Sequence, residues 1–183
     1  MDHYIEILIL PDPEFSASIL MNSLYTKLHK ALYDHKSTSI GVSFPHFQGN
    51  LGNLLRIHGT TSDLKKLKQQ NWIGGMGGYC KVSEVMQTPP NSTYRTVSRK
   101  QPTMSQSKLN RLLKRGSISH DEIKNYKAKM QSKTLTGPYL ELESGSNKNK
   151  HRRYISFGEL QRNPVPGEFD TFGLSKTATI PWF

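Results

Sequence analysis

The pattern of hydrophobic and polar residues predicts alternating strands and helices in the first half of the chain. Residues 4–10 are rich in β-branched and aliphatic side chains and stop at a Pro-Asp-Pro segment, which favours a strand that ends there. From residue 16 to about residue 34, leucines recur at every fourth position from Leu20 to Leu32. This spacing predicts a helix with one buried apolar stripe.

The segments that follow complete an order of strand, helix, strand, strand, helix and strand. Strands are expected at residues 39–44, 54–58 and 79–85, and a short helix capped by Ser62 is expected at residues 62–70. This order is typical of the ferredoxin-like (RRM-like) α+β fold, with both helices on one face of a sheet. Many unrelated proteins share that fold, so it does not define a function. The glycine and aromatic submotif of RNA-recognition modules is absent, so a base-stacking sheet surface is not expected.

A change in composition marks a boundary in the middle of the chain. Two prolines at positions 89 and 90 and the small polar residues after them resist both helix and sheet. Beyond them, residues 139–143 and 152–157 alternate like the strands of a β-hairpin. We therefore expect a ferredoxin-like domain at residues 1–90 and a smaller α+β region at residues 91–183.

Two short helices are expected between that boundary and the β-hairpin. Ser105 is placed to cap the first helix, and Gly116 is placed to end it. Ser119 and Glu122 then form a capping box at the start of a second helix. The tight turn between them predicts a helical hairpin.

Charge changes the picture, because it is concentrated in this second half. Residues 91–183 hold 17 Lys and Arg against 7 Asp and Glu, which accounts for +10 of the formal net charge of +11. Between Arg95 and Arg115 there are seven basic residues and no acidic one. Such a stretch predicts an anionic partner, either nucleic acid or an anionic membrane, although a solubilising surface is the alternative.

The first of the two short helices carries cations on one face. The spacing of i, i+3 and i+7, with one further cation alongside, gives a row that could meet RNA phosphates across a groove. Each neutralised phosphate releases counterions, so binding is expected to weaken with salt. The residues are Lys108, Arg111, Lys114 and Arg115.

Other chemistry is poorly supported by the sequence. The glycine-rich residues 74–78 lack the Lys-Ser/Thr of a phosphate loop, so we expect a flexible turn. Glu141 and Glu143 are interpreted as a strand edge, and without CxxC, HExxH or clustered Asp residues we expect no metal and no cofactor. The single cysteine, Cys80, allows no internal disulfide. With no apolar run of about 18 residues and no basic leader, we expect a cytoplasmic protein that does not enter the membrane.

Short segments with a shared order and spacing extend from one end of the chain to the other. They are residues 1–4 (MDHY), 11–15 (PDPEF), 27–29 (KLH), 40–45 (IGVSFP), 55–58 (LRIH), 94–95 and 97–99 (YR and VSR), Gln101, the basic helix, 173–176 (GLSK) and 181–183 (PWF). In these segments the chain resembles the Csy-type endoribonucleases of type I-F CRISPR systems, which cut the repeat hairpin of CRISPR precursor RNA.

The resemblance implies an RNA stem lying across the basic helix, cleavage at the base of the stem without metal, and retention of the product. By position, His29 in the first domain matches the catalytic histidine and Ser144 the active-site serine, with Ser146 close by. Arg99 and Gln101 match the pair that reads bases low in the stem. The partners implied are the repeat RNA hairpin, the crRNA product and other subunits of a type I-F surveillance complex, with a monomer as the enzyme.

Two positions depart from the family pattern. His151 stands where a phenylalanine stacks on the base beside the cut, and Phe172 stands where the active site has a tyrosine. Phe172 cannot donate a phenolic hydrogen bond, whereas the imidazole of His151 can still stack.

The chemistry expected of such a site needs only a positioned base. The ribose 2′-OH attacks the adjacent phosphate and leaves a 2′,3′-cyclic phosphate and a 5′-OH. An imidazole suits the removal of the proton because its ordinary pKa of about 6.5 lies near working pH. Two alternatives stay open: a non-catalytic RNA-hairpin-binding subunit of a ribonucleoprotein, and a general basic nucleic-acid binder.

Overall fold

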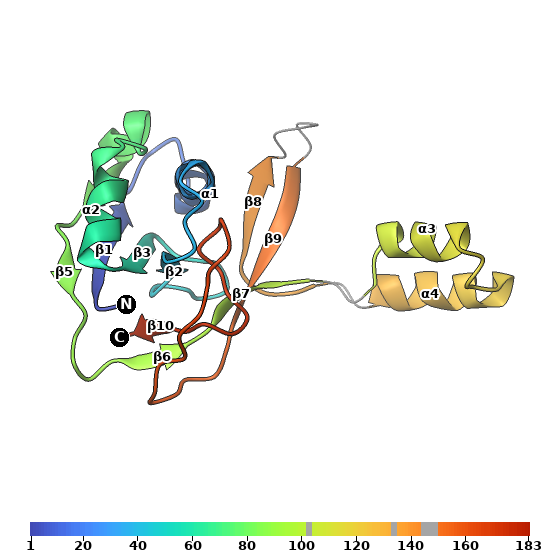
Figure 1. Ribbon diagram of the computed structural model, residues 1–183. Helices are drawn as coiled ribbons and strands as arrows, with labels where there is room; N and C mark the ends of the chain where they lie inside the picture. Colours follow the sequence, from blue (N-terminus) through green and yellow to red (C-terminus); the bar gives the residue numbers. More distant parts are fainter. Residues whose placement is uncertain (102–103, 133–134, 144–149) are drawn as a thin grey trace. The chain divides into compact units, whose positions relative to one another are not determined.

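The computed structural model describes residues 1–101, 104–132, 135–143 and 150–183. The chain divides into two compact units, one of residues 1–99 with 137–183 and one of residues 100–136 (Figure 1). This division differs from the boundary expected at residue 90. The reason is that Val97, Ile155 and Ile180 are buried in the same core as the first half of the chain.

The first unit is a mixed α+β structure built on a five-stranded antiparallel sheet. Four strands are ordered β2-β3-β1-β4, and β5 pairs with β1 beside β4. Helices α1 and α2 connect them in the order βαββαβ that the sequence predicts. The elements are β1 (His3–Ile9), α1 (Ala17–Asp34), β2 (Gly41–Ser43), β3 (Leu54–Gly59), α2 (Thr61–Gln69), β4 (Cys80–Val82) and β5 (Met86–Gln87).

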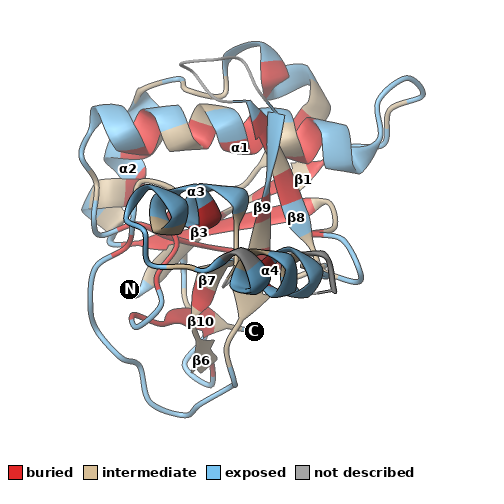
Figure 2. Cartoon of the chain, turned by 90° about the vertical axis from the view of Figure 1, so that its right-hand side faces the viewer, coloured by how far each residue is buried: buried red, intermediate tan, exposed pale blue. Residues whose placement is uncertain are grey.

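The main core lies between the two helices and one face of this sheet. On that face Ile5 pairs with Ile57 and Ile7 pairs with Leu55, and all four are almost fully buried. The leucine stripe of α1 is buried as predicted, and buried and exposed residues alternate along the helix (Figure 2). Burial of each such aliphatic side chain stabilises the fold by about 1.5–3 kcal/mol.

The opposite face of the sheet is covered by the end of the chain. Arg56 of β3 is only 6% exposed, and its Nε and Nη2 donate to Oε1 of Glu6 at 2.9 and 2.7 Å. Its Nη1 donates to the backbone oxygen of Phe183 at 2.9 Å, and its Cζ lies 3.8 Å from the centroid of that ring. Nearby, Nε2 of His58 lies 2.8 Å from Oγ of Ser43. The chain's own side chains therefore fill this face over Arg56 and His58.

Several short elements were not expected from the sequence. Residues Gly74–Tyr79 form a 3-10 helix, η1, where a flexible turn was predicted. The expected β-hairpin is confirmed as β8 and β9, and it gains β7 as a third strand in the order β7-β9-β8, while β6 pairs with β10. The strands are β6 (Thr93–Arg95), β7 (Val97–Lys100), β8 (Tyr139–Glu143), β9 (Lys150–Phe157) and β10 (Ile180–Trp182).

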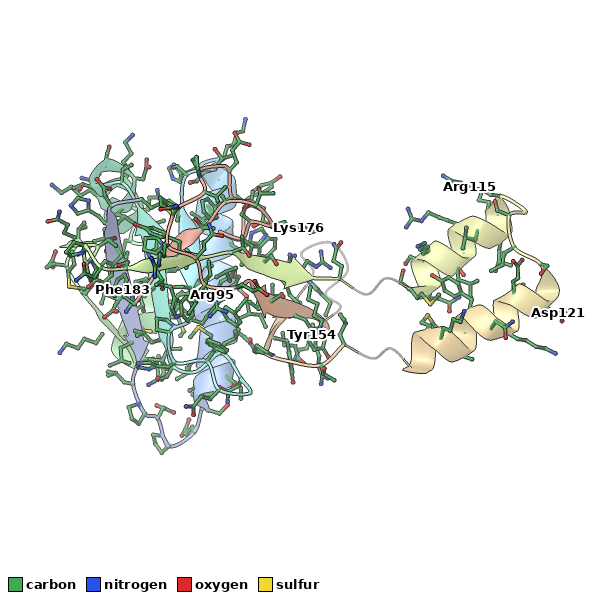
Figure 3. The ribbon with its side chains drawn as sticks, turned by 90° about the horizontal axis from the view of Figure 1, so that it is seen from below. Arg95, Arg115, Asp121, Tyr154, Lys176 and Phe183 are labelled. Atoms are coloured by element: carbon green, nitrogen blue, oxygen red, sulfur yellow. The ribbon has the colours of Figure 1, made fainter. Side chains whose placement is uncertain are left out.

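Arg95 belongs to the basic run of the sequence, but its charge is used inside the first unit (Figure 3). Its Nε and Nη2 donate to the carbonyl oxygen of Gly158 at 2.9 and 2.6 Å. Its guanidinium lies 4.7 Å from the ring of Trp182 and 5.4 Å from that of Phe157. Burial lowers the pKa of this arginine, because loss of water disfavours the charged guanidinium.

The second unit is the predicted helical hairpin, formed by α3 (Gln106–Lys114) and α4 (His120–Ser132). The backbone N–H of Ser119 donates to Oε2 of Glu122 at 2.8 Å, which confirms the capping box. Gly116 adopts φ +64° where α3 ends, and Figure 3 shows Arg115 and Asp121 at this closed end of the hairpin. Leu109 and Tyr126 are buried between the helices.

Two nearby residues, Thr60 and Ser62, could cap the start of α2. Thr60, and not the predicted Ser62, accepts a hydrogen bond from the N–H of Asp63, at 3.2 Å. We expect Thr60→Ala to lower the free energy of unfolding by about 1 kcal/mol, because the first turn of α2 loses its side-chain acceptor. The matched control, Ser62→Ala, is expected to change it by less than about 0.5 kcal/mol. Urea denaturation of both variants decides the cap, and a larger loss for Ser62→Ala would contradict it.

His58 gives the first unit a pH dependence of known sign. Burial and the neighbouring charge of Arg56 lower the pKa of His58 to about 3. As pH falls from about 6.5, the unfolded chain takes up a proton at this residue that the folded chain does not, so stability falls by up to about 1.4 kcal/mol per pH unit. Urea denaturation at several pH values should show a shallower slope for His58→Gln than for the parent between about pH 6.5 and 4. Equal slopes would rule out this contribution.

Candidate active site around His29

His29 lies on α1 at the border of the buried stripe, next to fully buried Leu28, and is itself half-buried. Its Nδ1 is 2.8 Å from the carbonyl oxygen of Thr171. A carbonyl only accepts hydrogen bonds, so Nδ1 carries the proton in this contact. The neutral ring therefore keeps its lone pair on Nε2, which is the atom available to accept a proton.

The contact with His29 depends on a tight turn at residues 170–173. Oδ1 of Asp170 accepts from the N–H groups of Phe172 and Leu174 at 2.9 and 3.0 Å. Gly173 adopts φ +67°, a left-handed conformation that favours glycine. The N–H of Val42 donates to the carbonyl oxygen of Gly173 at 3.0 Å, which attaches the turn to edge strand β2.

The turn presents the ring of Phe172 to the imidazole. The two rings are parallel to within 12°, with centroids 3.5 Å apart. One turn earlier on α1, the hydroxyl of Tyr25 donates to the carbonyl oxygen of Phe172. The structure thus brings together two of the residues expected at the site, His29 and Phe172, and it adds Tyr25, Asp170 and the carbonyl of Thr171.

Arg153 of β9 covers the other face of the Phe172 ring. Its Cζ is 3.5 Å from the ring centroid, and a group that close cannot share a face with the imidazole of His29. The residue is 7% exposed. Burial lowers the pKa of Arg153, and the positive charge of Arg99 acts in the same direction. The half-buried Arg99 of β7 therefore lies within electrostatic range of this stack.

The exposed end of β9 carries His151, another of the residues expected at the site. His151 pairs with Leu142 of β8. It lies two residues before Arg153, so both side chains project from the same face of the strand. In Figure 1 strand β8 runs beside α1, and the N–H of Glu141 donates to Oδ1 of Asn22 at 3.0 Å.

The remaining expected residues lie in the second unit or outside the described residues. The four expected cations, three in α3 and Arg115 as its C-cap, are exposed in the second unit, and Figure 2 shows how little of α3 is buried. Gln101 is likewise exposed in that unit. Ser144 and Ser146 lie outside the described residues, so their predicted role stays a prediction.

Two general features of the described chain bear on its chemistry. In the ranges that the structure describes, no three His, Cys, Asp or Glu side chains come together as a metal site. Within those same ranges, no helix is long and apolar enough to cross a bilayer.

Some of the site was accessible to sequence reasoning only through weak signals. An Asp followed by a Gly three residues later, as in residues 170–173, is a recognisable turn pattern. Arg153 stands in phase with buried Ile155, which places a charged residue on the inward face of a strand. The role of the Thr171 carbonyl cannot be found in the sequence, because every residue has a backbone carbonyl whatever its side chain.

Comparisons with known proteins place this arrangement in a family. The family model described as CRISPR-associated protein (Cas_Csy4) matches residues 4–183. A CRISPR-associated endonuclease Cas6/Csy4 of Escherichia coli (strain UTI89 / UPEC) is 40% identical over 184 residues, with all of both chains covered. A CRISPR-associated endonuclease Cas6/Csy4 of Pseudomonas aeruginosa (strain UCBPP-PA14) is 36% identical over 187 residues, again with full coverage. A CRISPR endoribonuclease Cse3 bound to 19 nt RNA matches over the full length of both chains with a TM-score of 0.40 and 13% identity.

The chain has an antiparallel α+β fold with a histidine held at this turn, and it matches CRISPR-associated endonucleases over its whole length. It is therefore a CRISPR-associated protein. Within that class the chain belongs to the Cas6/Csy4 family of type I-F systems. The resemblance found in the sequence is thereby confirmed.

The turn at residues 170–173 can be tested through its glycine. A Cβ on Gly173 would lie 2.8 Å from Cγ1 of Val42, and its φ is positive. We expect Gly173→Ala to lower the free energy of unfolding by about 1–3 kcal/mol. Gly77→Ala is the control, because a Cβ at Gly77 meets nothing within 4 Å. Urea denaturation that gave equal effects for the two variants would contradict the strain assigned to the turn.

Proposed function

We propose that this protein is a metal-independent endoribonuclease that binds the repeat hairpin of CRISPR precursor RNA and cuts at the base of its stem. Family membership supports the substrate class, because the curated relatives are CRISPR-associated endonucleases. The observation that carries the chemistry is the hydrogen bond between Nδ1 of His29 and the carbonyl of Thr171. It leaves Nε2 as a proton acceptor of fixed orientation.

The reaction that fits this group is attack by the ribose 2′-OH. Nε2 of His29 removes the 2′-OH proton while the 2′-oxygen forms a bond to the adjacent phosphorus. The bond from phosphorus to the 5′-oxygen then breaks, and that oxygen takes up a proton from the imidazolium or from water. The products are a 2′,3′-cyclic phosphate and a 5′-OH, and no redox partner is needed. Ser144 is proposed to position the 2′-OH or the phosphate, with Ser146 beside it.

Recognition of the hairpin is proposed to use the basic residues of both units. The exposed cations of α3 (Lys108, Arg111, Lys114 and Arg115) would bind phosphates along the stem. Arg99 and Gln101 would read bases low in the stem, and His151 would stack on the base beside the cut. We further propose that the monomeric enzyme keeps its crRNA product and joins other subunits of a type I-F complex.

A second candidate is a non-catalytic RNA-hairpin-binding subunit. The observation that favours it is Phe172, which has no hydroxyl to offer a reacting group although it lies directly on His29. Tight binding of the hairpin without any cleavage would identify this function.

The deciding experiment incubates the purified protein with candidate repeat hairpins in EDTA under single-turnover conditions. We expect cleavage by the parent protein, and we expect His29→Ala to slow it by about 10²–10⁴-fold because general-base catalysis is lost. The control is His35→Ala, an exposed histidine just after the same helix. Gel mobility and phosphatase treatment identify the product ends.

A substrate with one deoxyribose just upstream of the cut tests the nucleophile. It should bind with unchanged affinity and stay intact. Cleavage of that substrate, or an unchanged rate for His29→Ala, would rule out the proposed mechanism.

A further inference from the structure

We propose that Arg153 is an anion-binding residue of the cleavage site, where its guanidinium contacts a non-bridging oxygen of the scissile phosphate. The inference rests on the proposed function and adds a residue that the sequence did not single out. Three features support it: a buried Nε that has no acceptor among the described residues, the charge of the surroundings, and the position relative to His29.

The first observation is an incompletely paired buried charge. Arg153 is 7% exposed, and its Nε is buried without a hydrogen-bond partner among the described residues. None of the four ion pairs formed between described residues includes it. Arg56, which is 6% exposed, shows the usual arrangement, because its guanidinium bonds both Glu6 and the backbone oxygen of Phe183. Leaving the N–H of a buried guanidinium without an acceptor is costly, and it is the two Nη groups that remain to meet a ligand.

The second observation is the positive character of the neighbourhood. Arg99 lies close enough to lower the pKa of Arg153 by repulsion. Asp170 acts on Arg153 in the opposite direction, but its Oδ1 already accepts two backbone N–H groups. Burial raises the pKa of Tyr25, so its phenol stays neutral. Two arginines against one committed carboxylate favour an anion, and in an RNA substrate that anion is the phosphodiester.

The third observation is the position of the guanidinium relative to the base. Arg153 and His29 lie on opposite faces of the ring of Phe172. Cζ of Arg153 is 3.5 Å from the centroid of that ring, and the centroid of the His29 imidazole is also 3.5 Å from it. The 2′-OH and the phosphate that it attacks are joined through one ribose. One nucleotide at the edge of the Phe172 ring can therefore reach both groups.

Arg153 supplies hydrogen-bond donors that the phenyl ring of Phe172 lacks. Phe172 has no hydroxyl, but the cation stacked on it carries five N–H donors in a planar fork that suits phosphate oxygens. Negative charge grows on those oxygens as the 2′-oxygen bonds to phosphorus. A fixed guanidinium in a buried site would stabilise that charge.

The test compares Arg153→Met with the parent in two measurements on the full chain. The first is the single-turnover cleavage rate at saturating protein, and the second is the dissociation constant for the 2′-deoxy hairpin. Arg153→Met is expected to slow cleavage by about 10²–10³-fold, as for other lost transition-state donors, and to weaken binding by far less. Arg152→Met is the matched control, because Arg152 is exposed on the opposite face of the same strand.

Two further readouts separate phosphate contact from a purely structural role. Guanidinium ion added to Arg153→Ala should restore part of the cleavage rate. Replacing one non-bridging oxygen of the scissile phosphate by sulfur should slow the parent more than it slows Arg153→Met, because only the parent has the contact to lose.

The outcomes are distinguishable from those of the proposed function. If His29→Ala is inactive and Arg153→Met cleaves within threefold of the parent, the inference about Arg153 is wrong and the proposed function stands. A purely structural role predicts a different set of results: Arg153→Met is inactive and has a lower melting temperature, guanidinium does not restore Arg153→Ala, and the sulfur effect is unchanged. In that case Arg153 only supports the Phe172 ring. That result also overturns the inference. If both variants cleave like the parent, the proposed function fails.

Discussion

The hydrogen bonds from the Phe172 and Leu174 amides to the Asp170 carboxylate are the interaction on which the site depends. They fix a four-residue turn that supplies two contacts of His29, the carbonyl that sets its tautomer and the ring that lies against it. The turn is attached to β2, an edge strand of the main sheet, while the histidine comes from α1. The imidazole therefore becomes ordered only when segments about 140 residues apart in the chain have packed together.

Three arginines of the first unit show that charge has a different role at each place in the fold. Arg56 holds the end of the chain against the sheet through Glu6 and Phe183, and Arg95 is enclosed by aromatic rings while it bonds a carbonyl. Both are satisfied by the protein itself. Arg153 is as buried as Arg56 but has no comparable acceptors among the described residues. A count of basic residues along the sequence treats all three alike, whereas burial and partners separate cations that are paired within the protein from one that lacks such acceptors.

The sequence predicted the elements whose pattern is local and repeated. The leucine stripe gave α1, and the capping box at Ser119 gave the start of α4. It did not predict β6, β7 and β10, because strands of three or four residues show too little alternation and are stabilised by partners far along the chain. For the same reason the boundary expected at residue 90 differs from the observed division. His29 could be singled out from its helix position and the family resemblance, whereas the roles of Thr171 and Arg153 depend on contacts that no local pattern encodes.

The chain leaves the first unit after β7 and returns to it at β8, and these two strands flank β9 in the same small sheet. The helical hairpin is thus an insertion between two strands, β7 and β8, that both pair with β9. Its length and its surface can change without breaking the pairing of β7 and β8 with β9. The strand order of the small sheet therefore places no limit on what is inserted between β7 and β8.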